Sequence, residues 1–341
     1  MSKKPLLRIK NLKTYFYTDN GVVKAVDDID LDIYSGEFLG LVGESGCGKS
    51  ITSMSIMNLI EEPGRILDGN IFFHSTDLLK LNGKSMSEIR GNKISMIFQQ
   101  PLTSLDPVFT IGEQISEVFK IHKKTNKREL REKVINLLQL VGIADPENKI
   151  DSYAFELSGG QAQRVMIAMA LALQPELLIA DEPTTALDVT IQAQILDLLR
   201  GLREKINTSV ILITHDLGVI AETCDRVAVM YAGKIIEQAD VVSLFEHPLH
   251  PYTQGLLASV PVLGNVKDEL DAIPGNVPDL IDLPQGCRFA PRCKKREDNN
   301  LQICNEVEPN ILPVSSSEHI VRCWLYQKFE EDHLSIKSRN K

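Results

Sequence analysis

A glycine-rich loop of the form G-x4-G-K-S constrains the fold of this chain more than any other part of its sequence. Residues 43–50 read GESGCGKS, the apolar run FLGLV (38–42) comes before them, and the helix-compatible stretch ITSMSIMNLI (51–60) comes after. Strand, loop and helix in this order grip nucleotide phosphates, because Gly43 and Gly48 permit backbone conformations that a Cβ would forbid and the successive amides form a concavity for anions. The sequence therefore predicts an ATP-binding loop.

The residues of this loop have separate predicted roles. We expect the ammonium of Lys49 to reach the β- and γ-phosphates and the hydroxyl of Ser50 to bind Mg²⁺. The other predicted nucleotide contacts of the loop are Gly43, Glu44, Ser45, Gly46, Cys47, Gly48 and Ile51.

Length, charge and hydropathy narrow the class of protein. A chain of 341 residues is longer than one compact domain usually is, so we expect a nucleotide-binding domain with an appendage. The net charge of -9 argues against a duplex nucleic-acid ligand, because neutralising phosphates takes clustered lysines and arginines. The N-terminus lacks the apolar core of a signal peptide, and the longest apolar run, residues 165–173, is about half a membrane span. We therefore predict a cytosolic chain with no nucleic-acid partner.

Three short apolar runs predict an α/β core. The runs FLGLV (38–42), LLIA (177–180) and VILIT (210–214) each lead directly into polar residues, as buried parallel strands do when their carboxyl ends carry a site. Between the first two runs, residues 101–173 have a mostly helical pattern, clearest in KRELREKVINLLQLVGI, which predicts an inserted helical subdomain. After the third run, RVAVMYAGKIIEQA predicts a hairpin with a glycine at its turn.

A change of composition near His247 predicts a domain boundary. The sequence beyond it is rich in proline and lacks long periodic helices. We predict a nucleotide-binding domain over 1–246, a C-terminal extension over 247–330, and a disordered tail over 331–341.

Two further motifs supply chemistry suited to ATP hydrolysis. In ELLIADEP (176–183), Asp181 is expected to hold Mg²⁺ directly or through water, and Glu182 to polarise the attacking water. In ELSGGQAQR (156–164), a serine and two glycines open a helix whose unpaired amides can receive a second phosphate group. The predicted contacts of that helix are Ser158, Gly159, Gly160 and Gln161. One chain cannot apply both phosphate sites to one ATP.

With these motifs in this order, the chain resembles the ATP-binding cassette (ABC) family. The resemblance implies the P-loop NTPase fold of that family, an α/β RecA-like core with an antiparallel β subdomain and a helical subdomain, here followed by a small irregular C-terminal domain. It also implies that two subunits pair head to tail, so that each ATP lies between one phosphate loop and the partner's LSGGQ helix.

The resemblance assigns roles to four more residues. Gln99 in MIFQQP is similar to the glutamine that senses Mg²⁺ and the attacking water, and His215 in LITHD to the γ-phosphate contact. The segment TTALD, which ends at Asp188, resembles the loop that contacts the other subunit of the dimer. Phe16 in KTYFYT is placed like the aromatic side chain that stacks on adenine, with Tyr15 and Tyr17 as alternatives.

Three positions depart from the pattern expected of close relatives. Gln100 stands where an acid often follows the glutamine, Ala162 where arginine is common after LSGGQ, and Thr185 where serine is usual. None removes a catalytic atom. We expect Gln100 and Ala162 to border surfaces that face the transporter and the opposing subunit, which leaves the efficiency of coupling open.

The C-terminal segment resembles the extension found on ATPase subunits of bacterial dipeptide and oligopeptide importers. The resemblance rests on HPLHPYTQGLLASVPVL (247–263), PGNVPDL and GCRFAPRC. It implies two integral-membrane permease partners, a second related ATPase or a second copy of this chain, an external peptide-binding protein acting indirectly, and a place at the cytoplasmic face of the membrane. The same extension accompanies importers of nickel and some oligosaccharides, so those cargoes stay open.

Four cysteines in this extension ask for a metal or redox explanation, because a cytosolic protein is a poor setting for disulfides. They are Cys287, Cys293, Cys304 and Cys323. The absence of a CxxC pair lowers the case for zinc, whereas an iron–sulfur cluster tolerates looser spacing. Some members of the importer group carry a [4Fe-4S] cluster, and the resemblance implies one here, with zinc and free thiols as alternatives. Cys47 and Cys224 are not expected to be ligands.

Two rival functions share the nucleotide-site residues. One is a soluble cassette ATPase of DNA repair or the ribosome, and the acidic charge and single cassette count against it. The other is a regulatory iron–sulfur module with a degenerate nucleotide site, which conflicts with intact Lys49, Asp181 and Glu182.

Overall fold

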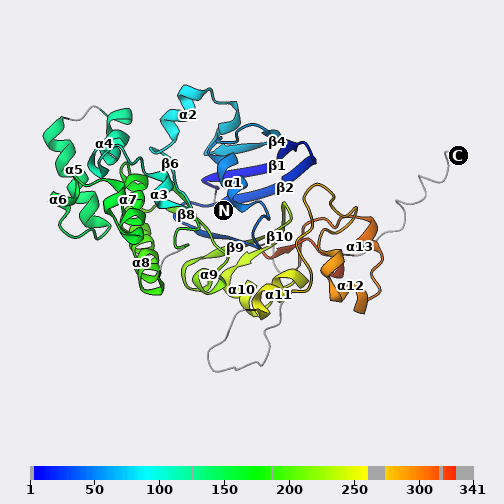
Figure 1. Cartoon of the computed structure of the whole chain (residues 1–341). Coiled ribbons are helices and arrows are strands. Elements are labelled where there is room, and N and C mark those ends of the chain that lie inside the picture. The colour runs from blue at the N-terminus through cyan, green and yellow to red at the C-terminus, as the bar shows by residue number, and fades with distance from the viewer. Residues whose placement is uncertain (1–3, 124–125, 186–187, 260–272, 315–317, 328–341) are drawn as a thin grey trace.

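Within the described part of the chain, two sheets form the framework (Figure 1). The computed structural model describes residues 4–123, 126–185, 188–259, 273–314 and 318–327. The larger sheet has the strand order β11-β12-β10-β9-β3-β8-β7-β6. Its strands are β3 (Phe38–Val42), β6 (Ile94–Ile97), β7 (Leu177–Asp181), β8 (Ser209–Ile213), β9 (Arg226–Tyr231), β10 (Lys234–Asp240), β11 (Leu312–Pro313) and β12 (Ile320–Val321).

The central part of this sheet is parallel and fully buried. β3 pairs in parallel with β8 and β9, and β7 pairs in parallel with β6 and β8. Every residue of β3, β7 and β8 is buried, as expected for strands covered on both faces. The three apolar runs predicted as strands, and the α/β core they imply, are confirmed.

The smaller sheet is antiparallel and has the order β2-β1-β4-β5. Its strands are β1 (Leu7–Thr18), β2 (Gly21–Ile33), β4 (Gly64–Phe73) and β5 (Thr76–Asp77). One apolar cluster joins the two sheets, since it contains Leu7 and Ile71 of the smaller sheet, Leu41 of β3, and Ile56 of helix α1 (Lys49–Ile56). The helix that follows the phosphate loop is therefore packed between both sheets. The turn η1 (Leu78–Lys80) and helix α2 (Gly83–Ile89) follow β5.

Helices occupy the chain between β6 and β7 and lie together at one end of the molecule (Figure 1). They are α3 (Pro101–Ser104), α4 (Ile111–His122), α5 (Lys127–Leu140), α6 (Pro146–Lys149), η2 (Ala154–Glu156) and α7 (Gly159–Leu171). In α5, the helix predicted from KRELREKVINLLQLVGI, the side chain of Asn126 caps the N-terminus, and Leu130, Val134 and Leu138 are buried at a spacing of four. The division of the chain into domains at 101–173 and 246 remains a prediction.

The chain after β7 returns to the large sheet. Helices α8 (Val189–Ile206) and α9 (Leu217–Thr223) flank β8, and the β9–β10 hairpin turns at Ala232 and Gly233 with φ of 44° and 83°. The predicted hairpin is confirmed, and positive φ at both turn residues matches the right-handed twist of its strands. Helices α10 (Val241–Glu246) and α11 (Pro251–Ala258) follow.

The C-terminal region packs beside β2 and β10, opposite the helices of 101–171 (Figure 1). It contains η3 (Ala290–Arg292), α12 (Lys294–Asp298), α13 (Ile303–Glu306) and η4 (Trp324–Tyr326), and β12 extends the large sheet by pairing with β10. The predicted disordered tail, 331–341, lies outside the described residues. Across the part of the chain that the structure describes, none of the helices has the length and apolar character that a membrane crossing requires.

Candidate functional site

The phosphate loop curls around the ammonium of Lys49. This ammonium donates hydrogen bonds of 2.8 Å to the carbonyl of Gly43 and 3.0 Å to that of Glu44, and the residue is 5% exposed. Gly43, Gly46 and Gly48 have φ of 153°, 77° and 107°. Because the helix α1 begins at Lys49, its first amides open toward the loop and provide the positive end of the helix dipole.

Two of these glycines are also required by close packing. A Cβ on Gly43 would lie 2.2 Å from the carbonyl oxygen of Met230, and one on Gly48 would lie 2.2 Å from that of Ala25. A Cβ on Gly46 would meet no atom within 4 Å. The loop is thus held against the β9–β10 hairpin and β2 at its two ends and is open in the middle.

The Asp181 carboxylate at the end of β7 has an unsatisfied oxygen beside the loop. The hydroxyl of Ser50 lies beside this carboxylate and favours its charged form, whereas the buried Oδ1 atom of Asp181 has no hydrogen-bond partner in the structure. Burial raises the pKa of Asp181, the charge of Glu182 adds to the rise, and Ser50 and Lys49 oppose it. A buried oxygen without a partner, next to a serine hydroxyl, fits a site for a hard divalent cation.

Glu182 brings together residues from three separate loops. Its Oε2 atom accepts hydrogen bonds from Gln99 Nε2 at 2.9 Å and from Thr185 Oγ1 at 2.8 Å. His215 Nδ1 lies 3.6 Å from Glu182 Oε1, and the His215 side chain is 69% exposed. The predicted catalytic residues Gln99, Glu182 and His215 therefore lie side by side at the carboxyl ends of β6, β7 and β8. The hydroxyl of Thr185, a position noted in the sequence as a departure, belongs to the same group.

The LSGGQ segment forms the start of α7. The hydroxyl of Ser158 accepts a bond of 3.3 Å from the amide of Gln161, and the side-chain oxygen of Gln161 accepts one of 3.1 Å from the amide of Ser158. Gly159 has no atom within 4 Å of a notional Cβ, whereas Gly160 faces Ile191 of α8. This capping box leaves the N-terminus of α7 exposed on the surface.

The remaining predicted nucleotide contacts lie around this centre. Asp188 caps α8 by accepting a bond of 3.0 Å from the amide of Ile191. Ser45 and Gly46 are exposed, Cys47 is buried, and Ile51 packs against the cluster between the sheets.

The candidate adenine side chains differ in their availability. The Tyr15 hydroxyl donates a hydrogen bond of 2.6 Å to the carboxylate of Asp27, so its side chain is held against β2 of the smaller sheet. Phe16 is half-buried against Gly64 of β4, and a Cβ there would come within 2.5 Å of the Phe16 ring. Tyr17 is 46% exposed, with the guanidinium of Arg65 5.9 Å from its ring centre.

One expectation about the departures is wrong. Ala162 is fully buried in the core of α7, so its methyl group does not border a surface. Gln100 is exposed, and its backbone carbonyl, at the N-terminus of α3, accepts hydrogen bonds from the hydroxyls of Thr103 and Ser104.

The four C-terminal cysteines line one cavity. Cys287, Cys293, Cys304 and Cys323 all face it. Their short helical turns bring them together: the amide of Cys287 donates to the carbonyl of Cys304 at 2.8 Å, and a Cβ on Gly286 would lie 2.3 Å from that carbonyl. Burial raises the pKa of Cys287 and of Cys323 to about 12, and the neighbouring thiols add to each rise. Among the described residues, no group of three or more His, Cys, Asp or Glu side chains is arranged to hold a metal ion.

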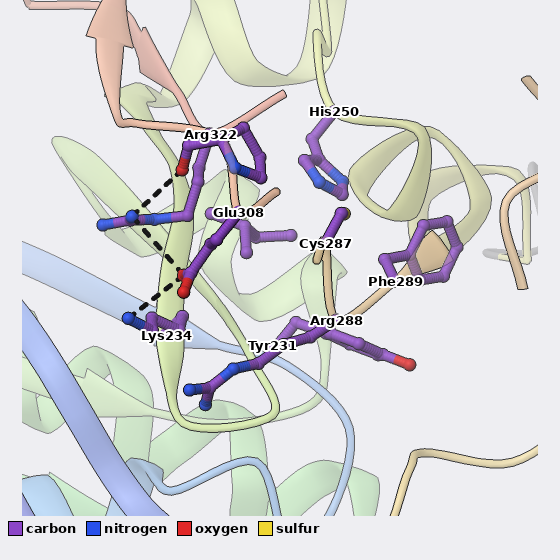
Figure 2. A pocket seen from close by; sticks show the side chains of 10 residues that line it. Tyr231, Lys234, His250, Cys287, Arg288, Phe289, Glu308 and Arg322 are labelled. Atoms are coloured by element: carbon purple, nitrogen blue, oxygen red, sulfur yellow. Dashed lines mark hydrogen bonds and ion pairs between the residues drawn. The ribbon is translucent and has the colours of Figure 1, made fainter. Parts of the chain in front are cut away.

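Ion pairs dock this C-terminal region on the rest of the chain. Figure 2 shows Glu308 between Lys234 of β10 and Arg322, with ion pairs of 3.0 and 3.6 Å. Arg288 bonds to Asp27 of β2 and to the carbonyl of Ala232. Nothing in the sequence around these residues predicted the contacts.

Sequence reasoning also missed a contact at the phosphate loop itself. The guanidinium of Arg292 forms a two-point ion pair with the Glu44 carboxylate, at 2.7 and 3.0 Å. The hydroxyl of Tyr252 accepts a hydrogen bond of 2.8 Å from the Glu44 amide. Both partners come from the segment that follows residue 247.

Comparison with protein families finds two matching models. Residues 26–185 match the family described as ABC transporter, and residues 236–299 match the family described as oligopeptide/dipeptide transporter, C-terminal region. The first match contains the phosphate loop, Gln99, LSGGQ and the Asp181–Glu182 pair, and the second contains Tyr252, Cys287 and Cys293.

Individual proteins resemble the chain over nearly its full length. The oligopeptide transport ATP-binding protein AppD of Bacillus subtilis is 53% identical over 324 residues, covering 95% of this chain and 97% of its own. The dipeptide transport ATP-binding protein DppD of the same organism is 49% identical and covers 96% of both chains. Among solved structures, the dimeric ATP-binding cassette MJ0796 with ADP and Pi is 28% identical, with a TM-score of 0.63 over 69% of this chain and 98% of its own.

Proposed function

The chain belongs to the ATP-binding cassette family of transporter ATPases and carries the C-terminal region of oligopeptide and dipeptide transporters, and on this premise we propose that it powers the uptake of peptides across the cytoplasmic membrane. The chain is an ATPase of the P-loop class, and the predicted ABC fold is confirmed. The observation that carries the cargo class is the similarity to AppD and DppD, which extends over 95% and 96% of the chain.

Glu182 is proposed as the general base of hydrolysis. Its carboxylate is 17% exposed and receives two hydrogen bonds, from Gln99 and Thr185, on the same oxygen. That leaves Oε1, the atom nearer His215, free of those donors and able to accept a proton from water. His215 is proposed to contact the γ-phosphate, and Lys49 to neutralise the β- and γ-phosphates.

Ser50 and Asp181 are proposed to hold Mg²⁺, with Gln99 close to the same site. The unpartnered Oδ1 atom of Asp181 and the adjacent Ser50 hydroxyl fit such an ion. When bound, Mg²⁺ supplies positive charge that stabilises the transferring phosphoryl group. The adenine ring is proposed to stack on Phe16, because Tyr15 is committed to Asp27.

A second ATPase subunit is proposed to complete the site. In a head-to-tail pair, the exposed N-terminus of α7 would contact the ATP that is bound to the phosphate loop of the other subunit. The residues of this N-terminus are Ser158, Gly159, Gly160 and Gln161. Asp188 would face the partner across that pair. The partner is either a related ATPase or a second copy, and the dimeric structure of the cassette MJ0796 supports pairing of two such subunits.

Two permeases are proposed to dock beside Gln99. Large apolar side chains are exposed at the residue before Gln99 and in the loop between α3 and α4: Phe98 is 39% exposed, Val108 73% and Phe109 52%. Exposed apolar side chains can be buried by a protein partner. The chain would therefore sit at the cytoplasmic face of the membrane, and a peptide-binding protein outside the cell would deliver cargo to the permeases.

We also propose that the four cysteines hold a [4Fe-4S] cluster. The four sulfur atoms line one cavity and match the number of thiolates that a [4Fe-4S] cluster takes as ligands, although the described residues contain no group of three or more side chains arranged to hold a metal ion. When bound, the cluster would cross-link the short helices and turns of a region with little apolar core.

Uptake by the assembled transporter tests the proposal. The chain is purified with its membrane partners, reconstituted in proteoliposomes with ATP inside, and offered radiolabelled dipeptides and oligopeptides with the external binding protein. We expect ATP-dependent peptide accumulation that unlabelled peptide competes away. Uptake of nickel or an oligosaccharide in place of peptide would contradict the cargo, and purification without any integral membrane protein would favour a soluble cassette ATPase.

A further inference from the structure

The short segment between Cys287 and Cys293 reaches the phosphate loop. It reads CRFAPRC, and its second arginine, Arg292, is 5% exposed at the side chain. Both terminal nitrogens of Arg292 bind the Glu44 carboxylate, at 2.7 and 3.0 Å, although the residues are 248 positions apart. A two-point arginine–carboxylate pair fixes orientation as well as distance.

Glu44 is held on its backbone as well as on its side chain. The Tyr252 hydroxyl accepts from the Glu44 amide, and the Glu44 carbonyl accepts from the ammonium of Lys49. The residue that precedes it, Gly43, supplies the other carbonyl bound to Lys49. Fixing Glu44 therefore fixes the two carbonyls that set the position of the phosphate-binding ammonium.

Arg292 is also held by its own backbone turn, which lies between two cysteines of the cavity, and by a hydrogen bond to Pro274. Its Nε atom donates to the carbonyl of Pro274 at 2.8 Å, and it closes the turn η3, in which the amide of Ala290 donates to Cys287 and the amide of Cys293 donates to Ala290. A cysteine of the cavity therefore stands at each end of the turn that carries Arg292. The ring centre of Phe289, the residue that precedes η3, lies 5.5 Å from that of Tyr252.

We propose that Arg292 is a positioning residue for the phosphate loop, and that the intactness of the four-cysteine site sets the affinity for Mg-ATP through the Arg292–Glu44 pair. Moving either cysteine moves η3, and η3 carries the guanidinium that orients Glu44. The proposal rests on the proposed function only in taking ATP as the nucleotide; it holds for any cargo.

A double-mutant cycle on the full chain, purified anaerobically, tests this inference. The equilibrium Kd of Mg-ATP is measured by calorimetry for the wild type, Glu44→Ala, Cys293→Ser and the double variant. We expect each single variant to bind about tenfold more weakly, the size expected when a partly buried charged hydrogen bond is lost, and the double variant to be no more than about threefold weaker than either single one.

Two arginine variants separate positioning from general damage. Arg292→Lys retains the charge and one bond, so we expect an intermediate Kd and a rise in KM for ATP larger than the fall in kcat. Arg296→Ala is the matched control, because Arg296 also lines the cysteine cavity but binds Asn305 and Glu297 within the C-terminal region. Its Kd should equal that of the wild type.

Three results would overturn the proposal. Wild-type affinity in Glu44→Ala would remove the role of the pair, and a double variant weaker by about a hundredfold would mean that Cys293 and Glu44 act independently. An equal loss of Mg-ATP affinity in Arg296→Ala and Arg292→Lys would mean that general disruption of the C-terminal region, rather than the Arg292–Glu44 pair, causes the weaker binding. Failure of peptide uptake would leave this cycle unaffected, so the two proposals fail separately.

Discussion

Gln99 Nε2 donates a hydrogen bond of 2.9 Å to Glu182 Oε2 across 83 residues of chain. The contact is possible because β6 and β7 are parallel neighbours, so the residues that follow them emerge at the same edge of the sheet. Gln99 is also two residues before α3, the first helix of the 101–171 segment. A displacement of that segment would therefore move Gln99 and change its hydrogen bond to Glu182, the proposed general base.

Glu182→Gln should bind Mg-ATP but release phosphate at least about a hundredfold more slowly, because an amide cannot take a proton from water while positioning and charge stabilisation remain. Phosphate release and nucleotide binding are measured on the same preparation. Glu176→Gln is the control, since Glu176 is paired with Lys93 and His74 at the surface, and its turnover should stay within about twofold. Undiminished turnover in Glu182→Gln would refute the assignment.

Thr185→Val should lower kcat by about tenfold, because it removes the hydroxyl that donates to the Glu182 carboxylate while keeping the side-chain shape. Thr185→Ser keeps the hydroxyl and should retain turnover within about twofold. The comparison is made at saturating ATP. Equal rates in the two variants would show that the 2.8 Å hydrogen bond has no part in hydrolysis.

Gly43→Ala should be far more damaging than Gly46→Ala, although both positions have positive φ. The added methyl group on Gly43 would lie 2.2 Å from the carbonyl of Met230, whereas that on Gly46 meets nothing within 4 Å. We expect Gly46→Ala to cost about 1–2 kcal/mol of unfolding free energy, the price of a left-handed backbone alone, and Gly43→Ala to cost more. Urea unfolding measures both, and a similar loss would contradict the packing argument.

Asp27→Asn should destabilise the chain by about 3 kcal/mol at neutral pH, because Arg288 and Lys234 would lose a buried partner. Burial raises the pKa of Asp27, but the bond from Tyr15 and the charges of Lys234 and Arg288 outweigh it and hold that pKa below its ordinary value. The wild type should therefore lose this stabilisation as pH falls below about 4, and the variant should lose less over the same range.

Asp68→Asn is the control for that measurement. Asp68 lies 3.7 Å from Lys13 and its side chain is 66% exposed, so its removal should change the unfolding free energy by less than about 1 kcal/mol. Unfolding is followed in urea between pH 7 and pH 3. Parallel curves for the wild type and Asp27→Asn would mean that Asp27 carries no folded-state shift.

Anaerobic purification should yield about four irons and four acid-labile sulfides per chain, since the four cysteine sulfurs can each bind one iron of a cubane. Iron, zinc and sulfide are measured on the same sample. Cys304→Ser should lower the iron content, whereas Cys224→Ser, at a buried cysteine outside the cavity, should not. One zinc without sulfide, or no metal, would contradict the cluster and leave the ATPase intact.

The parts of the site that lie next to a buried strand could be predicted, because a continuous apolar run in the sequence marks each strand. The phosphate loop follows β3 and the Asp181–Glu182 pair ends β7, so an apolar run locates each of them. Parallel strands then bring Gln99 and His215 to the same edge of the sheet. A prediction of the strands implies this shared edge, but it does not give the distances between the side chains.

The contacts of the C-terminal region could not be predicted in this way. Arg292 and Glu44 are 248 residues apart, and Arg292 lies in a three-residue turn without periodicity. Strands β11 and β12 have two residues each, too few for an alternating pattern. Ala162 was misjudged because α7 is buried on nearly all its faces, so a position after LSGGQ turns inward.

Strand β12 makes the C-terminal region part of the main sheet, and this limits how the protein can be shortened. It covers the outer edge of β10, and His319 pairs at 2.8 Å with Glu237, a carboxylate with no exposed surface. A fragment ending at residue 246 would uncover the part of β10 that pairs with β12, at Glu237 and Gln238, and leave the Glu237 carboxylate without its imidazole. Such a minimal cassette would associate edge to edge and would also lack Arg292 and Tyr252, so loss of activity on truncation would not by itself identify a missing catalytic group.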